Sequence, residues 1–110
     1  ETALNRVDEL LDVPGVDVVM IGPADLSVSL GVPGEFTHPK FVAAYEKIRD
    51  ACLKRGIAPG THNRSLELMQ MWKEKGFTFL GCGNETAMLF ERASTIIKGI
   101  SAAPGPQFKS

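Results

Sequence analysis

The chain has 110 residues, of which 44% are apolar and 23% are charged, and its formal net charge is −1. This length and composition predict one small globular domain, or part of one. Acidic and basic residues are interleaved, which argues against a nucleic-acid surface, and no apolar run reaches the roughly 18 residues that a membrane span needs.

The first predicted elements are a helix and a buried strand. Apolar residues recur at helical spacing over residues 4–11, and the Val-Pro-Gly at 13–15 ends that pattern. Residues 16–21 are apolar almost without alternation, which predicts a strand buried on both faces, as in a parallel sheet. A loop is expected over residues 22–39.

Helices and strands alternate in the rest of the chain. The expected elements are a helix over 41–52 that closes at Gly56, a strand over 57–60, a helix capped by Ser65 and ended by Gly76, a strand over 77–83 and a helix over 89–100. Residues 104–110 are expected to form a flexible tail, which leaves 1–103 as the folded part.

Alternation of this kind predicts right-handed βα units and a parallel sheet. Three strands alone make a poor parallel sheet, because both faces need cover and both edges would be bare. The chain is therefore expected to be the back portion of a larger α/β fold. A (β/α)8 barrel of about 250 residues and a doubly wound open sheet both fit the order of elements. The first residue is Glu1 rather than Met, so we expect a processed chain or a piece of a longer one.

Ligands of parallel α/β folds bind beyond the carboxyl ends of the strands. The residues at those places are Asp25, His62 and Cys82, and Glu1 would join them if a strand precedes it. Because adjacent strands lie about 4.8 Å apart, carboxylates from neighbouring strand ends can reach one hard cation such as Mg²⁺.

Each of these residues also has an ordinary structural interpretation. Asp25 can form a turn or cap a helix, Glu1 can be an exposed charge, and His62 can close a turn. His38 precedes a proline and is expected to be structural. Cys82 has no histidine nearby in sequence to activate it as a nucleophile. Cys52 and Cys82 are too few and too far apart for a disulfide framework or a CxxC metal site, so both are expected to be small buried hydrophobes in a reducing compartment.

One segment carries a specific resemblance. Ile-Gly-Pro-Ala-Asp-Leu-Ser-Val-Ser-Leu-Gly at 21–31, with Glu-Thr at 1–2, Val-Pro-Gly-Val-Asp at 13–17 and Gly-Cys-Gly-Asn-Glu-Thr-Ala-Met-Leu at 81–89, resembles the HpcH/HpaI family of metal-dependent 2-oxo-acid aldolases. The resemblance implies the C-terminal half of a (β/α)8 TIM barrel. It also implies cleavage or formation of C–C bonds in 4-hydroxy-2-oxo acids, giving pyruvate and an aldehyde through a metal-stabilised pyruvate enolate.

The resemblance also assigns site residues. Glu1 and Asp25 would bind a divalent metal, Mg²⁺, Mn²⁺ or Co²⁺, and the backbone N–H groups of Ala24 and Asp25 would bind the pyruvate carboxylate. The acid/base His, the carbonyl-binding Arg and a Gln of the family belong to the front half, so no catalytic residue is assigned within this chain. His62 follows Thr61 where relatives tend to be apolar, which favours a polar or acidic aldehyde.

Partners and alternatives follow from the same resemblance. Related barrels are homo-oligomers that often exchange the last helix, so a cytoplasmic trimer or hexamer is expected. Two other functions stay open at this point. One is a citryl- or malyl-thioester lyase of the same superfamily, and the other is a non-catalytic half-barrel.

Overall fold

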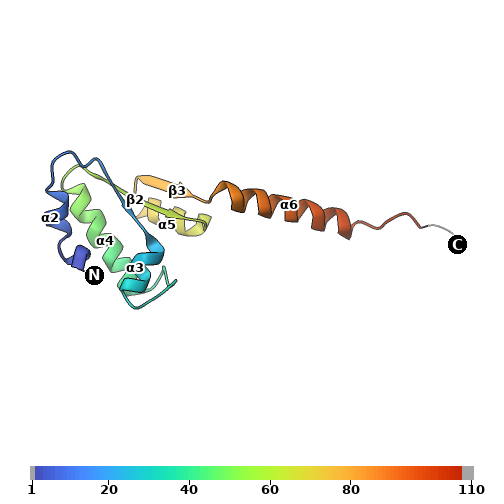
Figure 1. Ribbon diagram of the computed structural model, residues 1–110, viewed down its shortest axis with the longest axis horizontal. Coiled ribbons are helices and arrows are strands. Elements are labelled where there is room, and N and C mark those ends of the chain that lie inside the picture. Colours follow the sequence, from blue (N-terminus) through green and yellow to red (C-terminus); the bar gives the residue numbers. More distant parts are fainter. Residues whose placement is uncertain (1, 108–110) are drawn as a thin grey trace.

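The computed structural model describes residues 2–107 of the chain. Its elements are α1 (Thr2–Asn5), α2 (Val7–Leu11), β1 (Val18–Ile21), α3 (Pro23–Ser29), α4 (Pro39–Leu53), β2 (Ala58–Asn63), α5 (Leu66–Glu74), β3 (Phe79–Cys82) and α6 (Glu85–Ala102). Helices and strands alternate along the chain (Figure 1), which confirms the predicted α/β class.

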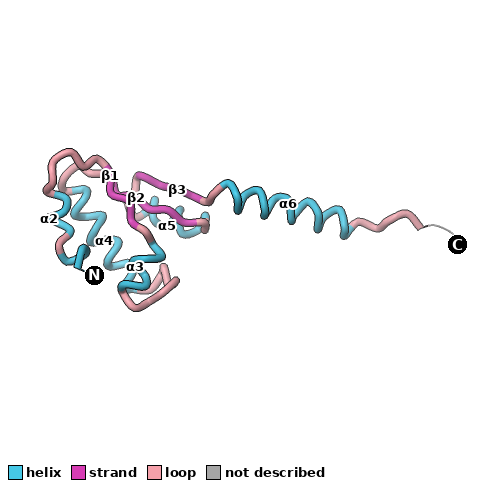
Figure 2. Tube along the Cα trace, viewed as in Figure 1, coloured by secondary structure: helices cyan, strands magenta, loops and turns pink. Residues whose placement is uncertain are grey.

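The three strands form one parallel sheet in the order β1-β2-β3 (Figure 2). Met20 pairs with Gly60 and Gly60 pairs with Phe79, so these three residues share one face of the sheet. The register continues to the pair of His62 with Gly81. Because residues alternate between faces, His62 lies on the face of Gly60, and Thr61 lies on the opposite face.

Polar side chains begin the longer helices. His38 accepts a hydrogen bond from the N–H of Lys40 at 3.1 Å, Ser65 accepts one from Leu68 at 3.3 Å, and Asn84 accepts one from Ala87 at 2.8 Å. Each cap satisfies an N–H group that the first helical turn leaves unpaired. The structural role expected for His38 and the capping role expected for Ser65 are both confirmed.

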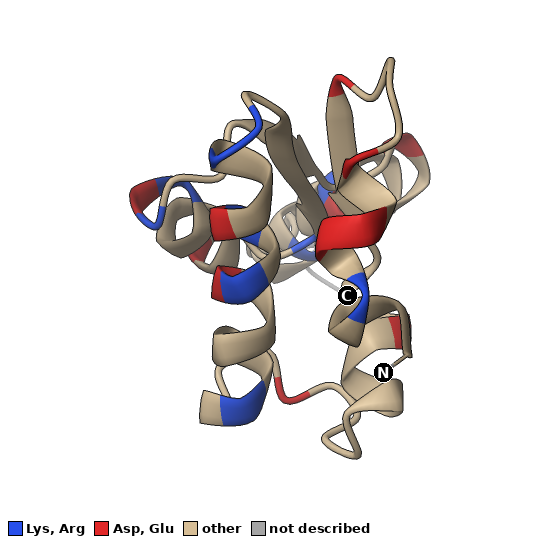
Figure 3. Ribbon diagram, turned by 90° about the vertical axis from the view of Figure 1, so that its left-hand side faces the viewer, with Lys and Arg blue, Asp and Glu red and all other residues tan. Residues whose placement is uncertain are grey.

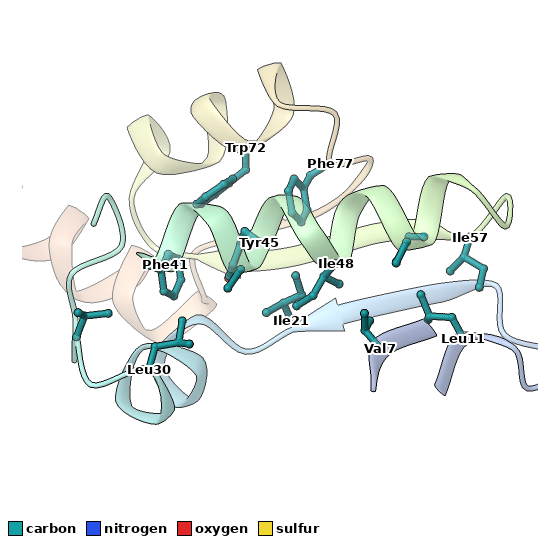
Figure 4. Close-up of a cluster of buried hydrophobic side chains, with 14 residues drawn as sticks. Val7, Leu11, Ile21, Leu30, Phe41, Tyr45, Ile48, Ile57, Trp72 and Phe77 are labelled. Carbon is teal, nitrogen blue, oxygen red and sulfur yellow. The ribbon is translucent and has the colours of Figure 1, made fainter. Parts of the chain in front are cut away.

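The core lies between the helices and one face of the sheet. Its centre is a set of aromatic rings on α4, on α5 and just before β3: Phe41, Tyr45, Trp72 and Phe77 (Figure 4). The centroids of Tyr45 and Trp72 are 4.4 Å apart, and those of Tyr45 and Phe77 are 5.4 Å apart. Tyr45 therefore joins α4 to the α5–β3 unit, and its ring contacts contribute beyond the area they bury.

Tyr45 also makes a polar contact within this core, through its hydroxyl group. Its hydroxyl lies 3.0 Å from Thr61 Oγ1, and the two residues are 0% and 1% exposed. Burial raises the pKa of Tyr45 to about 12, although the hydrogen bond with Thr61 acts in the lowering direction. This bond fixes the helix-facing side of β2 at the carboxyl end of the strand.

Arg55, just after α4, ties α2 to the core. Its guanidinium donates to Asp8 at 2.9 Å and to Asp12 at 2.8 Å. Together with the burial of Val7 and Leu11, this contact holds α2 against α4. The helical spacing predicted over residues 4–11 is confirmed, but the helix is interrupted at Arg6, whose φ of −110° and ψ of 23° are not helical.

Helix α6 extends away from the sheet and its helices (Figure 1), and the described chain measures 77 × 29 × 21 Å. None of its residues is buried. Its large exposed apolar side chains are Met88, Leu89, Phe90, Ile96, Ile97 and Ile100. No helix among residues 2–107 is long and apolar enough to cross a membrane. Acidic and basic residues are interspersed over the body of the molecule (Figure 3).

Three expectations from the sequence are wrong. The predicted loop over 22–39 contains α3, because Pro23 stands at the first helical position, where its fixed φ favours a helix and its missing N–H costs nothing. Strand β1 is not covered on both faces, since Val18 and Met20 remain 38% and 48% exposed. Strand β2 continues to Asn63, so His62 lies inside the strand rather than after it.

The cysteine and tail expectations have mixed outcomes. Cys52 is buried as expected, and burial raises the pKa of its thiol. Cys82 is exposed, and no other described residue of β3 is buried either. Residues 104–107 have no regular secondary structure, and residues 108–110 lie outside the described part.

A Gly60→Ala substitution should destabilise the protein. A Cβ at Gly60 would lie 3.0 Å from the Phe79 carbonyl oxygen and 3.1 Å from that of Val19, and backbone on both sides cannot yield. We expect a loss of about 1–3 kcal/mol in the free energy of unfolding, measured by urea denaturation of the complete gene product. Gly99→Ala in α6 is the control, because its Cβ would meet nothing within 4 Å, and it should not destabilise. Equal losses in both variants would contradict this account of Gly60.

The Tyr45 hydroxyl predicts a pH-dependent stability. Its pKa of about 12 exceeds the ordinary 10.0, so its contribution is complete below about pH 10 and is lost as the pH rises toward 12. Tyr45→Phe leaves Thr61 unpaired and should cost about 1 kcal/mol at pH 8. The gap between the parent and this variant in the free energy of unfolding, measured by urea denaturation, should then be smaller at pH 11 than at pH 8. A gap that stays constant between those pH values would refute the assignment.

Candidate functional site

The candidate site lies at the carboxyl edge of the sheet. In a parallel sheet this edge receives the residues that follow each strand. Asp25 follows β1 by four residues, His62 is the last residue but one of β2, and Cys82 ends β3. Since β1 and β2 are neighbours, Asp25 and His62 belong to adjacent strand ends. Glu1 lies outside the described residues, and Thr2, which follows it, begins α1.

Asp25 is an exposed carboxylate in the first turn of α3. Its Oδ2 lies 3.4 Å from the position that a Cβ on Gly22 would occupy, so the carboxylate folds back over the end of β1. Within residues 2–107, Asp25 forms no ion pair. The lack of a side chain at Gly22 leaves room for the carboxylate and for anything bound to it.

The same turn presents backbone donors. Leu26 N–H donates to the Gly22 carbonyl at 3.1 Å, and Pro23 has no N–H. The N–H groups of Ala24 and Asp25 are therefore the donors that the first turn leaves without an intrahelical acceptor. Both residues are exposed at the carboxyl edge of the sheet. Carboxylate and N–H groups at one turn can serve a cation and an anionic group of the same ligand.

A hollow of about 350 Å³ adjoins this turn. Its walls come from α1, α2, β1, α3 and α4, and they are apolar apart from a few polar groups. Asp25 is the charged residue of this lining, and Met20 and Ser29 also belong to it. An apolar hollow with a carboxylate at its rim has the usual composition of a small-molecule site.

The side chain of His62 is held by the residue that follows the neighbouring strand β3 rather than by a residue of its own strand. Its Nε2 lies 2.8 Å from the carbonyl oxygen of Gly83, which can only accept, so Nε2 carries a proton. The ring covers Gly81, where an added Cβ would lie 2.8 Å from His62 Cδ2. Gly81 is therefore required for this ring position, and the exposed imidazole faces the side of the sheet opposite Thr61.

A metal centre formed by the described residues of this chain alone would have few protein ligands. The described residues contain no group of three or more His, Cys, Asp or Glu side chains that could hold a metal ion. One exposed carboxylate still fits Mg²⁺ or Mn²⁺, because such ions often bind one or two protein carboxylates and keep several waters. The donors are oxygens, which suits these hard cations.

Sequence patterns assign no role to Ser27, and they do not indicate the contacts through which Thr61 and Gly81 shape the site. Ser27 is fully buried in α3, Thr61 is held by Tyr45 behind His62, and Gly81 makes room for the imidazole. A signal existed for Gly81, because a glycine inside a strand often marks the close approach of another group. The Ser27–Gly34 and Tyr45–Thr61 contacts join residues that are 7 and 16 positions apart, beyond one helical turn or strand pair, and no local pattern indicates them.

Comparison with known families gives one extended match. Residues 1–91 match the sequence model of the family described as HpcH/HpaI aldolase/citrate lyase. The 4-hydroxy-2-oxo-heptane-1,7-dioate aldolase of Escherichia coli is 36% identical over 94 residues, which are 86% of this chain and 36% of the aldolase. The chain thus spans little more than a third of the curated relatives it matches.

Solved structures agree with this match. An HpcH/HpaI aldolase from Desulfitobacterium hafniense DCB-2 superposes with a TM-score of 0.82 at 33% identity, covering 96% of this chain and 41% of that one. A HpcH/HpaI aldolase/citrate lyase family protein from Burkholderia cenocepacia J2315 gives a TM-score of 0.83 at 24% identity, covering 90% of this chain and 38% of that one. The second likeness concerns the fold alone. Partial coverage of both agrees with the expected portion of a larger barrel.

Proposed function

Because the chain belongs to the HpcH/HpaI aldolase/citrate lyase family, we propose that the complete protein is a metal-dependent aldolase acting on 4-hydroxy-2-oxo acids. The reaction would release or use pyruvate and an aldehyde. The observation that carries the proposal is the exposed carboxylate of Asp25 beside open backbone donors at the carboxyl edge of the sheet. The relatives at 36% identity are named aldolases, which favours this activity over a citryl- or malyl-thioester lyase.

In this proposal Asp25 and Glu1 hold the divalent cation, Mg²⁺, Mn²⁺ or Co²⁺. A bound cation supplies Lewis-acid stabilisation of the negative charge that develops on the 2-oxo acid. The N–H groups of Ala24 and Asp25 bind and orient the carboxylate of pyruvate. Gly22 lets the substrate approach the backbone, since it carries no side chain at the end of β1. The chain places no acid/base residue of its own in this scheme.

His62 is proposed to contact the aldehyde. It lies on the strand next to β1, its side chain is exposed, and its ring is fixed by Gly83 and Gly81. A fixed polar ring rejects an apolar partner, because its unsatisfied ring nitrogen would lose contact with water. The aldehyde is therefore proposed to be polar or acidic.

Assembly and location complete the proposal. The apolar side chains of α6 are exposed, with Leu89 at 74% and Phe90 at 73%, which supports a homo-oligomer in which α6 is covered. We propose a trimer or a hexamer from the resemblance to the family alone. Both cysteines are unpaired, which supports a reducing, cytoplasmic environment.

Removal of the metal tests the central claim. In the complete gene product, chelation or Asp25→Asn should reduce pyruvate release from a panel of 4-hydroxy-2-oxo acids by at least about a hundredfold in kcat/KM. Asp17→Asn is the matched control, because Asp17 lies at the opposite end of β1, and it should leave the rate near that of the parent. Pyruvate release that survives chelation and Asp25→Asn would exclude the proposed mechanism.

Substitution of His62 tests the aldehyde assignment separately. His62→Leu should lower the ratio of kcat/KM for a polar or acidic aldehyde over an apolar one by about tenfold. His38→Asn serves as the control, because it removes the other histidine and leaves a residue that can cap α4. An unchanged aldehyde preference in His62→Leu would leave the aldolase proposal standing and remove His62 from it.

A further inference from the structure

Ser27 is a buried polar residue one turn after the candidate ligand turn. It is 0% exposed and is the one buried residue among the described residues of α3. Its Oγ donates to the carbonyl oxygen of Ala24 at 2.7 Å and accepts from the N–H of Gly34 at 3.0 Å. This hydroxyl uses its one donor and one of its two acceptor lone pairs, and its loss leaves two backbone groups without this partner.

The first of these bonds acts on one peptide plane. The carbonyl of Ala24 and the N–H of Asp25 belong to the same planar group and point in opposite directions. The carbonyl of Ala24 points along the axis of α3, as in any α-helix, and the Ser27 hydroxyl adds a buried donor to it. This bond therefore restrains the peptide plane that carries the Asp25 N–H on its opposite side. The Asp25 Cα is also an atom of this plane, so the same bond fixes the start of the carboxylate side chain.

The second bond fixes Ser27 itself. Gly34 lies seven residues further along, in the loop before α4, and its N–H reaches Ser27 Oγ. The N–H of Val32 also donates to the Ser27 carbonyl at 2.9 Å. Two contacts from the 32–34 segment thus hold the end of α3 in place. The serine hydroxyl cannot rotate away from Ala24 without giving up the Gly34 bond.

From this geometry we propose that Ser27 is a positioning residue for Asp25, which restrains the Ala24–Asp25 peptide and with it the N–H and the Cα from which the carboxylate side chain starts. The inference rests on the proposed function, in which Asp25 binds the divalent cation. A residue that orients a metal ligand changes metal affinity when it is removed, even though it never touches the ion.

The test measures binding of Mn²⁺ alone. Free Mn²⁺ is quantified by electron paramagnetic resonance in titrations of the complete gene product, with no substrate and no turnover. Ser27→Ala should raise the Kd for Mn²⁺ by about tenfold. Ser27→Cys keeps a weaker donor and should raise it by about threefold. Should Ser27→Ala fail to fold, the Ser27→Cys titration decides, and a Kd equal to that of the parent overturns the proposal.

Tyr45→Phe is the matched control. It also removes a buried hydroxyl that bonds across the core, but its partner Thr61 lies on β2 rather than at the Asp25 turn. The midpoint temperature of thermal unfolding should fall in both Ser27→Ala and Tyr45→Phe, whereas the Kd for Mn²⁺ should change only in Ser27→Ala. Equal affinity in the two variants would overturn the positioning role.

Asp25→Asn separates this inference from the proposed function. Mn²⁺ binding lost in Asp25→Asn but unchanged in Ser27→Ala overturns the role of Ser27 and leaves the metal site intact. Mn²⁺ binding that is unchanged in Asp25→Asn overturns both, because there is then no ligand for Ser27 to position.

Discussion

The packing of α4 against β2 through Tyr45 is the contact on which the arrangement of the chain depends. The Tyr45 ring contacts Trp72 and Phe77, and its hydroxyl reaches Thr61 at the carboxyl end of the strand. A helix, the next βα unit and one strand end are thus fixed by a single side chain. Because β2 is the central strand, β1 and β3 are both aligned on it.

The two faces of the sheet differ in the side chains that they carry and in how tightly these are packed. Residues on the helix-facing side are held by close apolar packing, which tolerates little change of volume. On the other face, Gly60 and Gly81 leave room for Phe79 and for the ring of His62. Glycines on this face therefore determine where the larger side chains lie. The polar side chain of His62 is thus positioned by a strand rather than by a loop, which favours a fixed geometry.

Much of this was predictable from the sequence, and the failures have physical causes. The parallel α/β class and the helix cap at Ser65 follow from local spacing. Helix α3 was missed because Gly22 and Pro23 signal a turn as readily as a helix start. The contacts of Ser27 and of Thr61 cross 7 and 16 residues and depend on how the chain returns to itself, so composition and periodicity do not report them.

The isolation of α6 has a consequence for cooperativity. The described chain has a radius of gyration of 20.3 Å, whereas a compact chain of this length would have about 13 Å. The 18-residue helix α6 has no buried residue within the described chain, so it gains little from tertiary packing, which supplies most of the stability of helices in proteins. In an isolated copy, α6 would fray and melt as a unit of its own, while the aromatic core around Tyr45 unfolds in a separate transition. Coupling between the two transitions would then arise only where another surface covers the apolar side chains of α6.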